Sequence, residues 1–485
     1  MSHHTATKAA QSRFREVMPL RTLLLLAALA ALLALPSGAS ARSSQFTMFE
    51  APRELLSDDA ALRAQTFDEI QGFGVHWVRL VLYWQSVAPD PASASVPAFD
   101  ERDPNAYPGF GRYDRAIAEA RARGMRVLLT VSGPVPKWAT RERKDNVTRP
   151  SPTRFERFMT AVGRRYRDQI SYWAIWNEPN HPDFLQPQYA AGKRPVSPGI
   201  YRQLVQAADR GLTASGNGSD RVWIGETAPR GTGKDVAPLT FLRGALCLNA
   251  NYHKRPSCKR LAGDGWAHHA YTPASGPFFV PPSRNDVTIG VLDRLNSALS
   301  KAGRAGAIRR DMPIYLTEFG IQSFPDKISG VSQQQQAEYR AISEHIAYGN
   351  GRVRGFSQYL MRDDVPRAGS VLERHGGFES GLRTSDGKVK LAYEGFRLPL
   401  VATRGSRSTA LWGLVRPATG RTTVTIEYRN SDGAPWHRLK SKATGATGYW
   451  STTTSLRSGR SYRVRWTAPN ATEYTGPATR AYRAP

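Results

Sequence analysis

The sequence has only two cysteines among 485 residues, so it is neither a disulfide-rich scaffold nor a protein built around a cysteine-based metal cluster. It has a single long apolar run, close to its start, which excludes a protein with several membrane spans. It has no glycine-rich phosphate loop, no metal-ligand motif and no nucleic-acid-binding motif. We therefore expect no metal, no other cofactor and no nucleic-acid partner.

Acidic residues are also scarce relative to basic ones. The chain has 40 Asp and Glu residues against 67 Lys and Arg residues, which gives a formal net charge of +27. The rest of the composition is typical of a globular protein, with 40% hydrophobic and 22% charged residues. The basic charge favours acidic surfaces but does not identify one.

The first 41 residues have the pattern of a secretory signal peptide. Arginines precede an apolar run at residues 23–35, and the small residues Ala-Ser-Ala at 39–41 form a cleavage site. A membrane anchor is the alternative, but Pro36 ends the run before it reaches the roughly 20 residues needed to cross a bilayer. We predict cleavage after Ala41, secretion, and no membrane span in the mature chain.

Cys247 and Cys258 lie close together in a loop-like stretch, CLNANYHKRPSC. In an exported chain this spacing favours a local disulfide. Metal binding is the alternative, but it would need further ligands, and His253 is the one residue between the thiols that could supply one.

From about residue 45 to residue 400, β-rich runs alternate with amphipathic helical patterns, and the alternation completes eight times. The expected strands are QFTMFEA, VHWVRLVLYW, MRVLLTVSG, ISYWAIWNEPN, DRVWIGETAP, DGWAHHAYTP, MPIYLTEFGI and VRGFSQYLM. Helical patterns between them include residues 113–124, 153–169, 199–216, 291–303 and 333–349, and Gly124, Gly216 and Gly303 are expected to end helices.

Eight strand and helix units with short connections predict a parallel sheet closed into a (β/α)8 barrel over residues 42–403. An open, doubly wound sheet is the alternative, but no glycine-rich phosphate turn follows the first strand.

After residue 403 the helical period disappears, and short β-rich runs lie between Gly, Pro, Asn and Asp residues. We predict an all-β sandwich over residues 404–485. Two runs, TVTIEYR and SYRVRWT, each place apolar residues on one face, which predicts two inward surfaces that pack together. The residues are Val424, Ile426 and Tyr428 in the first run, and Tyr462, Val464 and Trp466 in the second. This tail holds fourteen Lys and Arg residues against three acidic ones, so its net charge is +11.

Two glutamates end otherwise apolar strands of the predicted barrel. Glu178 ends the fourth strand, where alternation places it on the same side as Ala174 and Trp176, and Glu318 ends the seventh strand after Ile314 and Leu316. A (β/α)8 barrel has its active site at the carboxyl ends of its strands. Two carboxyl groups at one barrel mouth form the pair that glycoside cleavage requires. The alternative for either glutamate alone is a simple ion pair with an arginine.

The runs WNEPN at 176–180 and TEFG at 317–320 resemble signatures of a large clan of retaining glycoside hydrolases with (β/α)8 barrels, which includes many cellulases, mannanases, xylanases and β-glycosidases. The resemblance covers roughly residues 45–400. It implies that Glu178 is the general acid/base and Glu318 the nucleophile, and that Asn177 hydrogen-bonds the sugar 2-hydroxyl.

Several further residues are candidates for the site. Arg79 is expected to keep the nucleophile ionised, the alternative being a structural barrel arginine, and Tyr271 is expected to donate to Glu318. His268 and His269 are candidate pocket residues; adjacent strand residues face opposite sides, which excludes a zinc site. Candidates for stacking on sugar rings are Trp84, Trp138 and Trp176, with core packing as the alternative. Glu226 is a third strand-end carboxylate, and the alternatives for it are a substrate ligand and a carboxylate with no role in the reaction.

The chain departs from the clan at two strand ends. Many members have a tryptophan after the eighth strand and a histidine after the third, where this chain has FSQYLMRDD and LLTVSGPVPKW. Gln358, Tyr359 or Trp138 is expected to take these places.

The first hypothesis for the function is a secreted retaining glycosidase. For that reaction we expect Glu178 and Glu318 to lie roughly 5 to 5.5 Å apart, with the pKa of Glu178 raised by their repulsion. A transglycosylase would use the same residues, and a non-catalytic carbohydrate-binding barrel should lack one of the two glutamates. The expected partners are a saccharide substrate and, through the basic tail, an anionic cell-wall polymer.

Overall fold

The computed structural model of the chain describes residues 45–484. The expected signal segment at residues 1–41 lies outside them. Eight parallel strands form a closed barrel in the order β1-β10-β9-β8-β7-β4-β3-β2, so the predicted fold class is confirmed. The barrel strands are β1 (Phe46–Glu50), β2 (Trp77–Tyr83), β3 (Arg126–Ser132), β4 (Tyr172–Ile175), β7 (Arg221–Thr227), β8 (Gly265–His269), β9 (Ile314–Glu318) and β10 (Val353–Tyr359).

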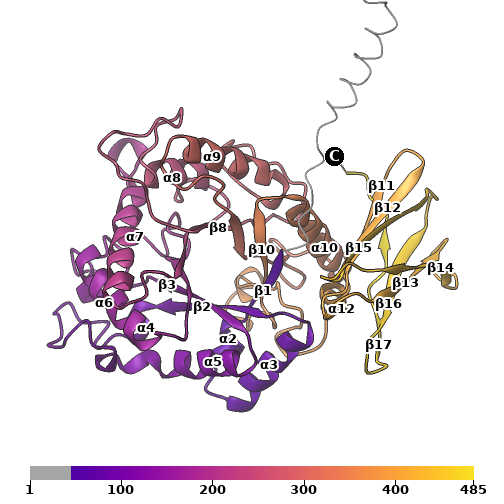
Figure 1. The fold of residues 1–485 in the computed structure, drawn as a ribbon, viewed down its shortest axis with the longest axis horizontal. Helices are drawn as coiled ribbons and strands as arrows, with labels where there is room; N and C mark the ends of the chain where they lie inside the picture. The colour runs from indigo at the N-terminus through magenta and orange to yellow at the C-terminus, as the bar shows by residue number, and fades with distance from the viewer. Residues whose placement is uncertain (1–44, 485) are drawn as a thin grey trace, which may run out of the picture. The chain divides into compact units, whose positions relative to one another are not determined.

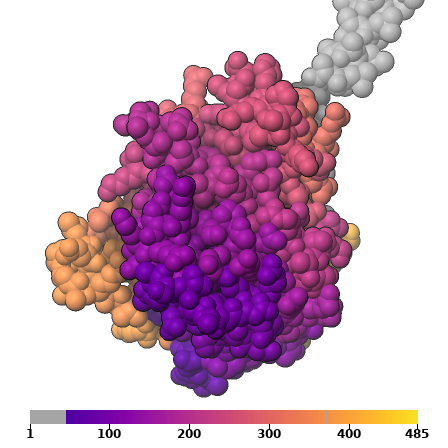
Figure 2. Space-filling view, turned by 90° about the vertical axis from the view of Figure 1, so that its left-hand side faces the viewer, coloured from indigo at the N-terminus to yellow at the C-terminus, as the bar shows by residue number. Residues whose placement is uncertain are grey.

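Helices surround the barrel strands, as Figure 1 shows. They are α2 (Pro52–Leu55), α3 (Ala60–Gly72), α4 (Trp84–Val87), α5 (Gly111–Ala122), α6 (Pro152–Arg165), α7 (Ser197–Ala214), α8 (Pro238–Ala245), α9 (Leu292–Arg304), α10 (Gln333–Gly349), α11 (Val371–Arg374) and α12 (Leu391–Arg397). A short hairpin of β5 (Tyr189–Ala190) and β6 (Arg194–Pro195) lies in the loop after β4. Figure 2 shows one face of the molecule, formed mainly by the first half of the chain in indigo and magenta.

Local sequence signals explain where these helices begin and end. The Ser332 side chain and Gln335 form a capping box at the start of α10, and the Ser151 hydroxyl caps α6. Gly124 and Gly216 follow α5 and α7 with φ of 68° and 84°, the left-handed conformation that glycine accommodates. The expectation for Gly303 is wrong, because α9 continues to Arg304 and Gly306 adopts the positive φ instead.

Aromatic rings fill the barrel interior near the amino-terminal ends of the strands. Phe46 stacks on Trp77 with ring centroids 4.4 Å apart, and Trp223 stacks on Tyr315 at 3.7 Å. Trp77 and Trp223 are themselves stacked at 6.0 Å, so the rings form one continuous layer. We call these four residues the aromatic floor. The floor closes the amino-terminal end of the barrel. The polar residues of the interior lie at the opposite end, at the carboxyl ends of the strands.

The tail forms two antiparallel sheets with a shared apolar core, drawn in orange and yellow in Figure 1. The first sheet contains β11 (Leu400–Arg404), β12 (Ser408–Leu414) and β15 (Tyr449–Ser455). The second contains β13 (Thr423–Arg429), β14 (His437–Ala443), β16 (Ser461–Thr467), β17 (Glu473–Thr475) and β18 (Thr479–Arg480).

One detail of the predicted sandwich is wrong. The two runs expected to face each other are β13 and β16, which are neighbours in the same sheet, with Ile426 paired to Val464. Their apolar residues therefore form one inner surface. The opposite surface comes from the first sheet, through Leu400, Ala402, Leu411 and Trp450.

A buried ion network joins the tail to the barrel. Arg416 donates to Glu344 of α10 at 2.6 Å and to the carbonyl oxygen of Phe396 at 2.7 Å. Arg340 donates to the same oxygen of Glu344, Oε2, at 3.1 Å. Apolar residues of α10 and the first tail sheet pack around it, including Ala341, Ile342, Val401, Trp412, Leu414 and Tyr449. The tail therefore packs on α10 through a desolvated contact.

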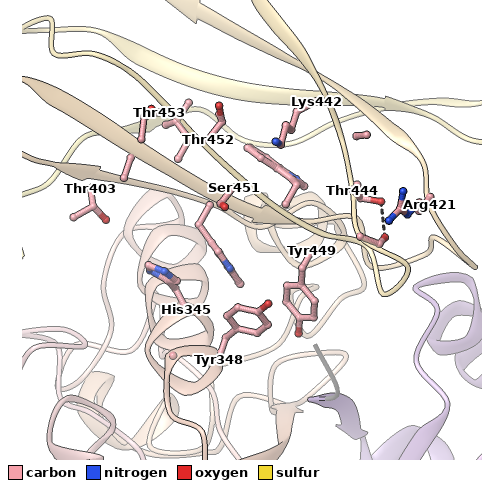
Figure 3. A pocket seen from close by; sticks show the side chains of 17 residues that line it. His345, Tyr348, Thr403, Arg421, Lys442, Thr444, Tyr449, Ser451, Thr452 and Thr453 are labelled. Atoms are coloured by element: carbon pink, nitrogen blue, oxygen red, sulfur yellow. Dashed lines mark hydrogen bonds between the residues drawn. The ribbon is translucent and has the colours of Figure 1, made fainter. Parts of the chain in front are cut away.

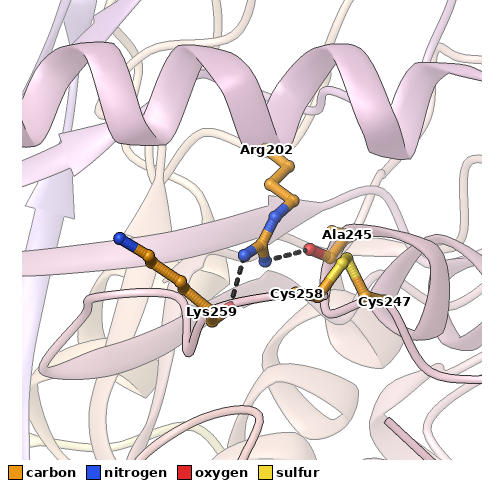
Figure 4. The surroundings of a disulfide bond; sticks show 5 residues. All are labelled: Arg202, Ala245, Cys247, Cys258 and Lys259. Atoms are coloured by element: carbon orange, nitrogen blue, oxygen red, sulfur yellow. Dashed lines mark hydrogen bonds between the residues drawn. A yellow bond between two sulfur atoms is a disulfide. The ribbon is translucent and has the colours of Figure 1, made fainter. Parts of the chain in front are cut away.

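Cys247 and Cys258 form a disulfide, with their Cα atoms 6.3 Å apart. Figure 4 shows Arg202 of α7 donating to the carbonyl oxygens of Ala245 and Lys259, one near each cysteine. The bridge and this arginine both fix the loop between α8 and β8. Over residues 45–484, none of the helices has the length and apolar character required to cross a membrane.

Candidate active site

A cavity of about 660 Å³ opens at the carboxyl ends of the barrel strands. Its lining includes the candidate residues Asn177, Glu178, Tyr271 and Glu318. The other lining residues are Glu50, Pro52, Arg53, Leu56, Val81, Tyr83, Ser86, Arg112, Tyr113, His181, Asp183, Phe184, Tyr359 and Phe378. The cavity lies where a (β/α)8 barrel places its active site.

Arg79 of β2 lies beneath this cavity, with no exposed surface. Its guanidinium donates to Glu226 at 2.8 Å and to Glu318 at 3.1 Å, and it also donates to Glu50. A further bond of 2.6 Å runs to the side-chain oxygen of Asn177. Arg79 therefore holds three carboxylates and an amide in fixed positions, and the contact with Glu318 is the one expected from the sequence.

Glu226 reaches Arg79 because β7 contains an irregularity. Residues Gly225 and Glu226 both lie opposite Ala267 of β8, and their φ angles are 107° and 41°. A Cβ atom on Gly225 would lie 2.7 Å from the carbonyl oxygen of Ala267, so this position requires glycine. Glu226 is fully buried on Arg79, which makes it a support of the site and not a group that contacts a substrate.

Glu318 reaches the mouth through a second irregularity, in β9. Tyr315 pairs with Ala267 and Glu318 pairs with His269, so β9 has one more residue than β8 in this interval. The sequence-based alternation was wrong here, since Ile314 and Leu316 pack in the outer layer against the helices. The extra residue turns Glu318 inward all the same.

Glu178 follows β4, which ends at Ile175. Trp176 and Glu178 have φ of 71° and 39°, so the strand alternation stops before them. Trp176 points away from the barrel interior, where its indole donates to Phe184 O at 2.9 Å and its ring meets Phe155 edge to face. The expectation that Trp176 faces the interior is therefore wrong. The same turn exposes Glu178 to the cavity.

His269 joins the two candidate catalytic glutamates. Its Nδ1 lies 2.9 Å from Glu178 Oε1 and 3.6 Å from Glu318 Oε2. Burial opposes a charge on His269, but the charge of Glu318 and the bond to Glu178 outweigh it and raise the pKa of His269. Burial also opposes a charge on Glu178 and therefore acts to raise its pKa. The hydrogen bond and the charge of His269 lower that pKa overall. The expected rise in the pKa of Glu178 is therefore wrong, because the hydrogen bond and the charge of His269 outweigh the effect of burial.

Glu50 at the end of β1 is a fourth carboxyl group of the site. Burial raises its pKa to about 8 against the opposing charge of Arg79. Glu50 therefore binds a proton more readily than an exposed glutamate does. Proton uptake by Glu50 would reduce the excess negative charge of the three carboxyl groups around Arg79.

Tyr271 and Asn177 each present a polar group to the cavity. The Tyr271 hydroxyl donates to Glu318 Oε1 at 2.7 Å, the contact expected from the sequence. Asn177 accepts from Arg79 through its oxygen, which leaves its amide nitrogen as the group that can donate to a ligand.

Four predicted pocket residues lie elsewhere. His268 is buried behind the strand, bonded to Thr227 and to Val287 O, and burial lowers its pKa to about 4. Gln358 is buried outside the barrel, where it accepts from Arg340. Trp84 and Trp138 pack edge to face in the core. These side chains lie outside the cavity because they occupy the layer between strands and helices.

Several lining residues were not predicted. Tyr83 and Phe184 stack on one side of the cavity with centroids 6.5 Å apart, and Phe378 contacts Tyr359 and Tyr271 on another. Glu50 had a signal in the sequence, because it ends the first expected strand as Glu318 ends the seventh. Phe184 and Phe378 are in loops, where no strand period indicates direction.

Across residues 45–484 no group of three or more His, Cys, Asp or Glu side chains has a geometry that could hold a metal ion.

No family model and no curated protein sequence matches this chain. Solved structures that match include a family 39 glycoside hydrolase from the gut symbiont Bacteroides cellulosilyticus WH2, with 14% identity, a TM-score of 0.49, and coverage of 87% of this chain and 81% of that chain. The exo-β-1,4-mannosidase Op5Man5 from Opitutaceae bacterium strain TAV5 matches with 15% identity, a TM-score of 0.45, and coverage of 75% and 61%. A β-glucosidase from Exiguobacterium marinum matches with 14% identity, a TM-score of 0.45, and coverage of 68% and 84%. At these values the matches carry no argument about the reaction.

Proposed function

We propose that this chain is a secreted retaining glycoside hydrolase that cleaves O-glycosidic bonds by double displacement. The observation that carries the proposal is the pair of carboxyl groups, Glu178 and Glu318, that line one barrel-mouth cavity and share one histidine nitrogen. One carboxyl group protonates the leaving oxygen and the other meets the positive charge that develops at the anomeric carbon.

The spacing of the pair favours retention of configuration. The two oxygens cannot be further apart than the sum of their distances to His269 Nδ1, 2.9 Å and 3.6 Å. That limit is where the range for inverting pairs begins, roughly 6.5 to 9.5 Å, because those enzymes must fit a water molecule between sugar and base. Direct attack by Glu318 on the sugar fits this closer arrangement.

In the first step, Glu178 gives a proton to the glycosidic oxygen as its bond to the anomeric carbon breaks, and Glu318 forms an ester with that carbon. The proton belongs to the pair of His269 and Glu178, and Glu178 carries it when His269 is neutral. Arg79 and Tyr271 hold Glu318 in position for attack. In the second step, Glu178 takes a proton from water, the water oxygen bonds to the anomeric carbon, and Glu318 is released.

Asn177 and the aromatic side chains would position the sugar. The free amide nitrogen of Asn177 lies beside the reacting carboxylates, where it can donate to a 2-hydroxyl. The rings of Tyr83, Phe184 and Phe378 give apolar faces for sugar stacking.

The basic tail supports a second part of the proposal, in which the enzyme is held near an anionic cell-wall polymer. The tail carries a net charge of +11, and attraction between exposed charges weakens as salt shortens the Debye length to roughly 8 Å. Binding to purified cell-wall material should therefore fall as salt is added. Binding that does not change with salt would contradict this part.

The reaction is tested by Glu318→Ala and Glu178→Ala on a panel of aryl β-glycosides. Glu318→Ala should lose nearly all hydrolysis, and azide should restore turnover to the glycosyl azide of opposite anomeric configuration. Glu178→Ala should still react with substrates that have good leaving groups, and azide should give the retained anomer. Asp183→Asn, at a cavity-lining carboxylate whose side chain is 78% exposed, is the matched control and should keep activity. An inverted product from the unmodified enzyme would overturn the mechanism.

A further inference from the structure

A second cavity, of about 950 Å³, lies between α10 and the first tail sheet (Figure 3). Figure 3 shows His345 and Tyr348 on the helix side and Thr403, Ser451, Thr452 and Thr453 on the strands opposite. We call this cavity the tail groove. It is separate from the barrel mouth, since the two cavities have no lining residue in common.

The walls of the tail groove combine aromatic rings with hydroxyl groups. Trp412 stacks with His345 at 4.8 Å between centroids, and Tyr348 packs against Tyr449 at 4.2 Å. The hydroxyls of Ser451 and Thr453 lie on exposed positions of β15, on the same strand face as Tyr449. Trp412 and Tyr449 are buried in the contact with α10, so the partly exposed rings of this wall are those of His345 and Tyr348. Partly exposed rings beside hydroxyl groups suit the apolar faces and hydroxyl edges of sugar rings.

The charge of the groove has one sign. Arg421 and Lys442 line it, and no Asp or Glu residue does. Figure 3 places both cations along one side of the groove, near Thr444. Over residues 45–484, neither cation has an ion pair or a side-chain hydrogen bond.

The acidic residues of the tail are all engaged elsewhere. Glu427 pairs with Arg463 at 2.7 Å, and Glu473 pairs with Arg465 at 2.5 Å. Asp432 pairs with Arg429 and Arg480. The positive charge of the groove is therefore left for a ligand from outside the chain.

We propose that the tail groove binds a carboxylate-bearing polysaccharide, such as a chain of uronic acid residues. The uncompensated cations Arg421 and Lys442 select an anion, and the aromatic and hydroxyl walls select sugar rings. A polyol phosphate supplies the charge but no rings, and a neutral glycan supplies rings but no charge. The inference refines the proposed attachment of the tail to an anionic polymer and is independent of the chemistry at the barrel mouth.

Binding of polygalacturonate oligosaccharides to the full chain tests the inference. The measurement uses isothermal titration with the Glu318→Ala variant, so that hydrolysis plays no part. The double substitution Arg421→Gln with Lys442→Gln, made in that variant, should weaken binding about tenfold or more, because it removes both charge-assisted contacts. The matched control is Arg407→Gln with Arg457→Gln, which removes two exposed tail charges outside the groove. It should weaken binding less than twofold.

If the groove substitutions and the control substitutions weakened binding equally, the groove would not be the binding site. Such a result would indicate attraction of the ligand to the tail as a whole. Equal affinity for a neutral oligosaccharide of the same length would overturn the acidic ligand. Sedimentation that shows a dimer, lost in the groove variant, would assign the groove to a second copy and overturn the proposal. Failure of azide rescue at Glu318 would contradict the glycosidase proposal and leave these binding results unchanged.

Discussion

His269 Nδ1 lies 2.9 Å from Glu178 Oε1, and this bond controls how the proton is shared at the site. His269 lowers the pKa of Glu178, so His269→Asn should raise it by removing the charge. An acid catalyst with a higher pKa keeps its proton to higher pH. We therefore expect the alkaline limb of kcat/KM to move to higher pH.

The neighbouring His268 provides the control for that change. It is bonded to Thr227 and to Val287 O and has no hydrogen bond to Glu178 or Glu318. His268→Asn should change the amplitude of the profile through stability but not the position of its limbs. If the pH profiles of kcat/KM had limbs at the same pH for His269→Asn and for the unmodified enzyme, His269 would not set the pKa of Glu178.

Glu50 makes the stability of the fold depend on pH. Its pKa is about 8 in the folded protein and 4.5 ordinarily, so the folded state binds more protons between these values. This contribution to stability is fully present below pH 4.5 and is lost as pH rises through 8. Glu50→Gln removes the titration, so its Tm relative to the unmodified protein should be higher at pH 8.5 than at pH 5. Calorimetry at the two pH values measures the difference, and a constant difference would show that Glu50 is ionised throughout.

The disulfide closes a loop with a sequence separation of 11 residues. Closing a loop of this size lowers the conformational entropy of the unfolded chain, which stabilises the folded state by about 2 to 3 kcal/mol. Cys247→Ser with Cys258→Ser should therefore lower the free energy of unfolding by that amount in denaturant titrations. The unmodified protein with reductant is the control and should fall to the same stability. Linked peptides in a non-reducing digest check the bond directly, and two free thiols would remove its basis.

Arg416 should be needed for the tail to stay packed on the barrel. Arg416→Ala leaves Glu344 buried with Arg340 as its remaining partner, so we expect a loss of about 3 kcal/mol in unfolding free energy. Arg404→Ala, at an exposed tail position, should change stability by less than about 0.5 kcal/mol. A small loss for Arg416→Ala would indicate that the apolar packing alone holds the two parts together.

The sequence predicted the barrel because strand and helix periods recur over eight units, and each period depends on local residues. It predicted Glu178 and Glu318 as a pair because Glu318 ends one buried strand and Glu178 closely follows another. It failed for Trp176 and Leu316, because backbone irregularities at strand ends change the direction of side chains without changing the apolar pattern. It also missed the control of Glu178 by His269, since pKa depends on distances between strands that are far apart in the sequence.

The aromatic floor has a consequence for the order of events in catalysis. With the lower end of the barrel filled by Phe46, Trp77, Trp223 and Tyr315, the carboxyl groups are reached through the upper opening. In a glycosidase with this architecture, the substrate, the aglycone, water and the product all pass through one opening of the active-site cavity. The aglycone must then leave before a water molecule can take its place beside Glu178. An alcohol bound at this opening would compete with water for the glycosyl group attached to Glu318. The fraction of enzyme with an alcohol bound there would then determine the ratio of glycosyl transfer to hydrolysis.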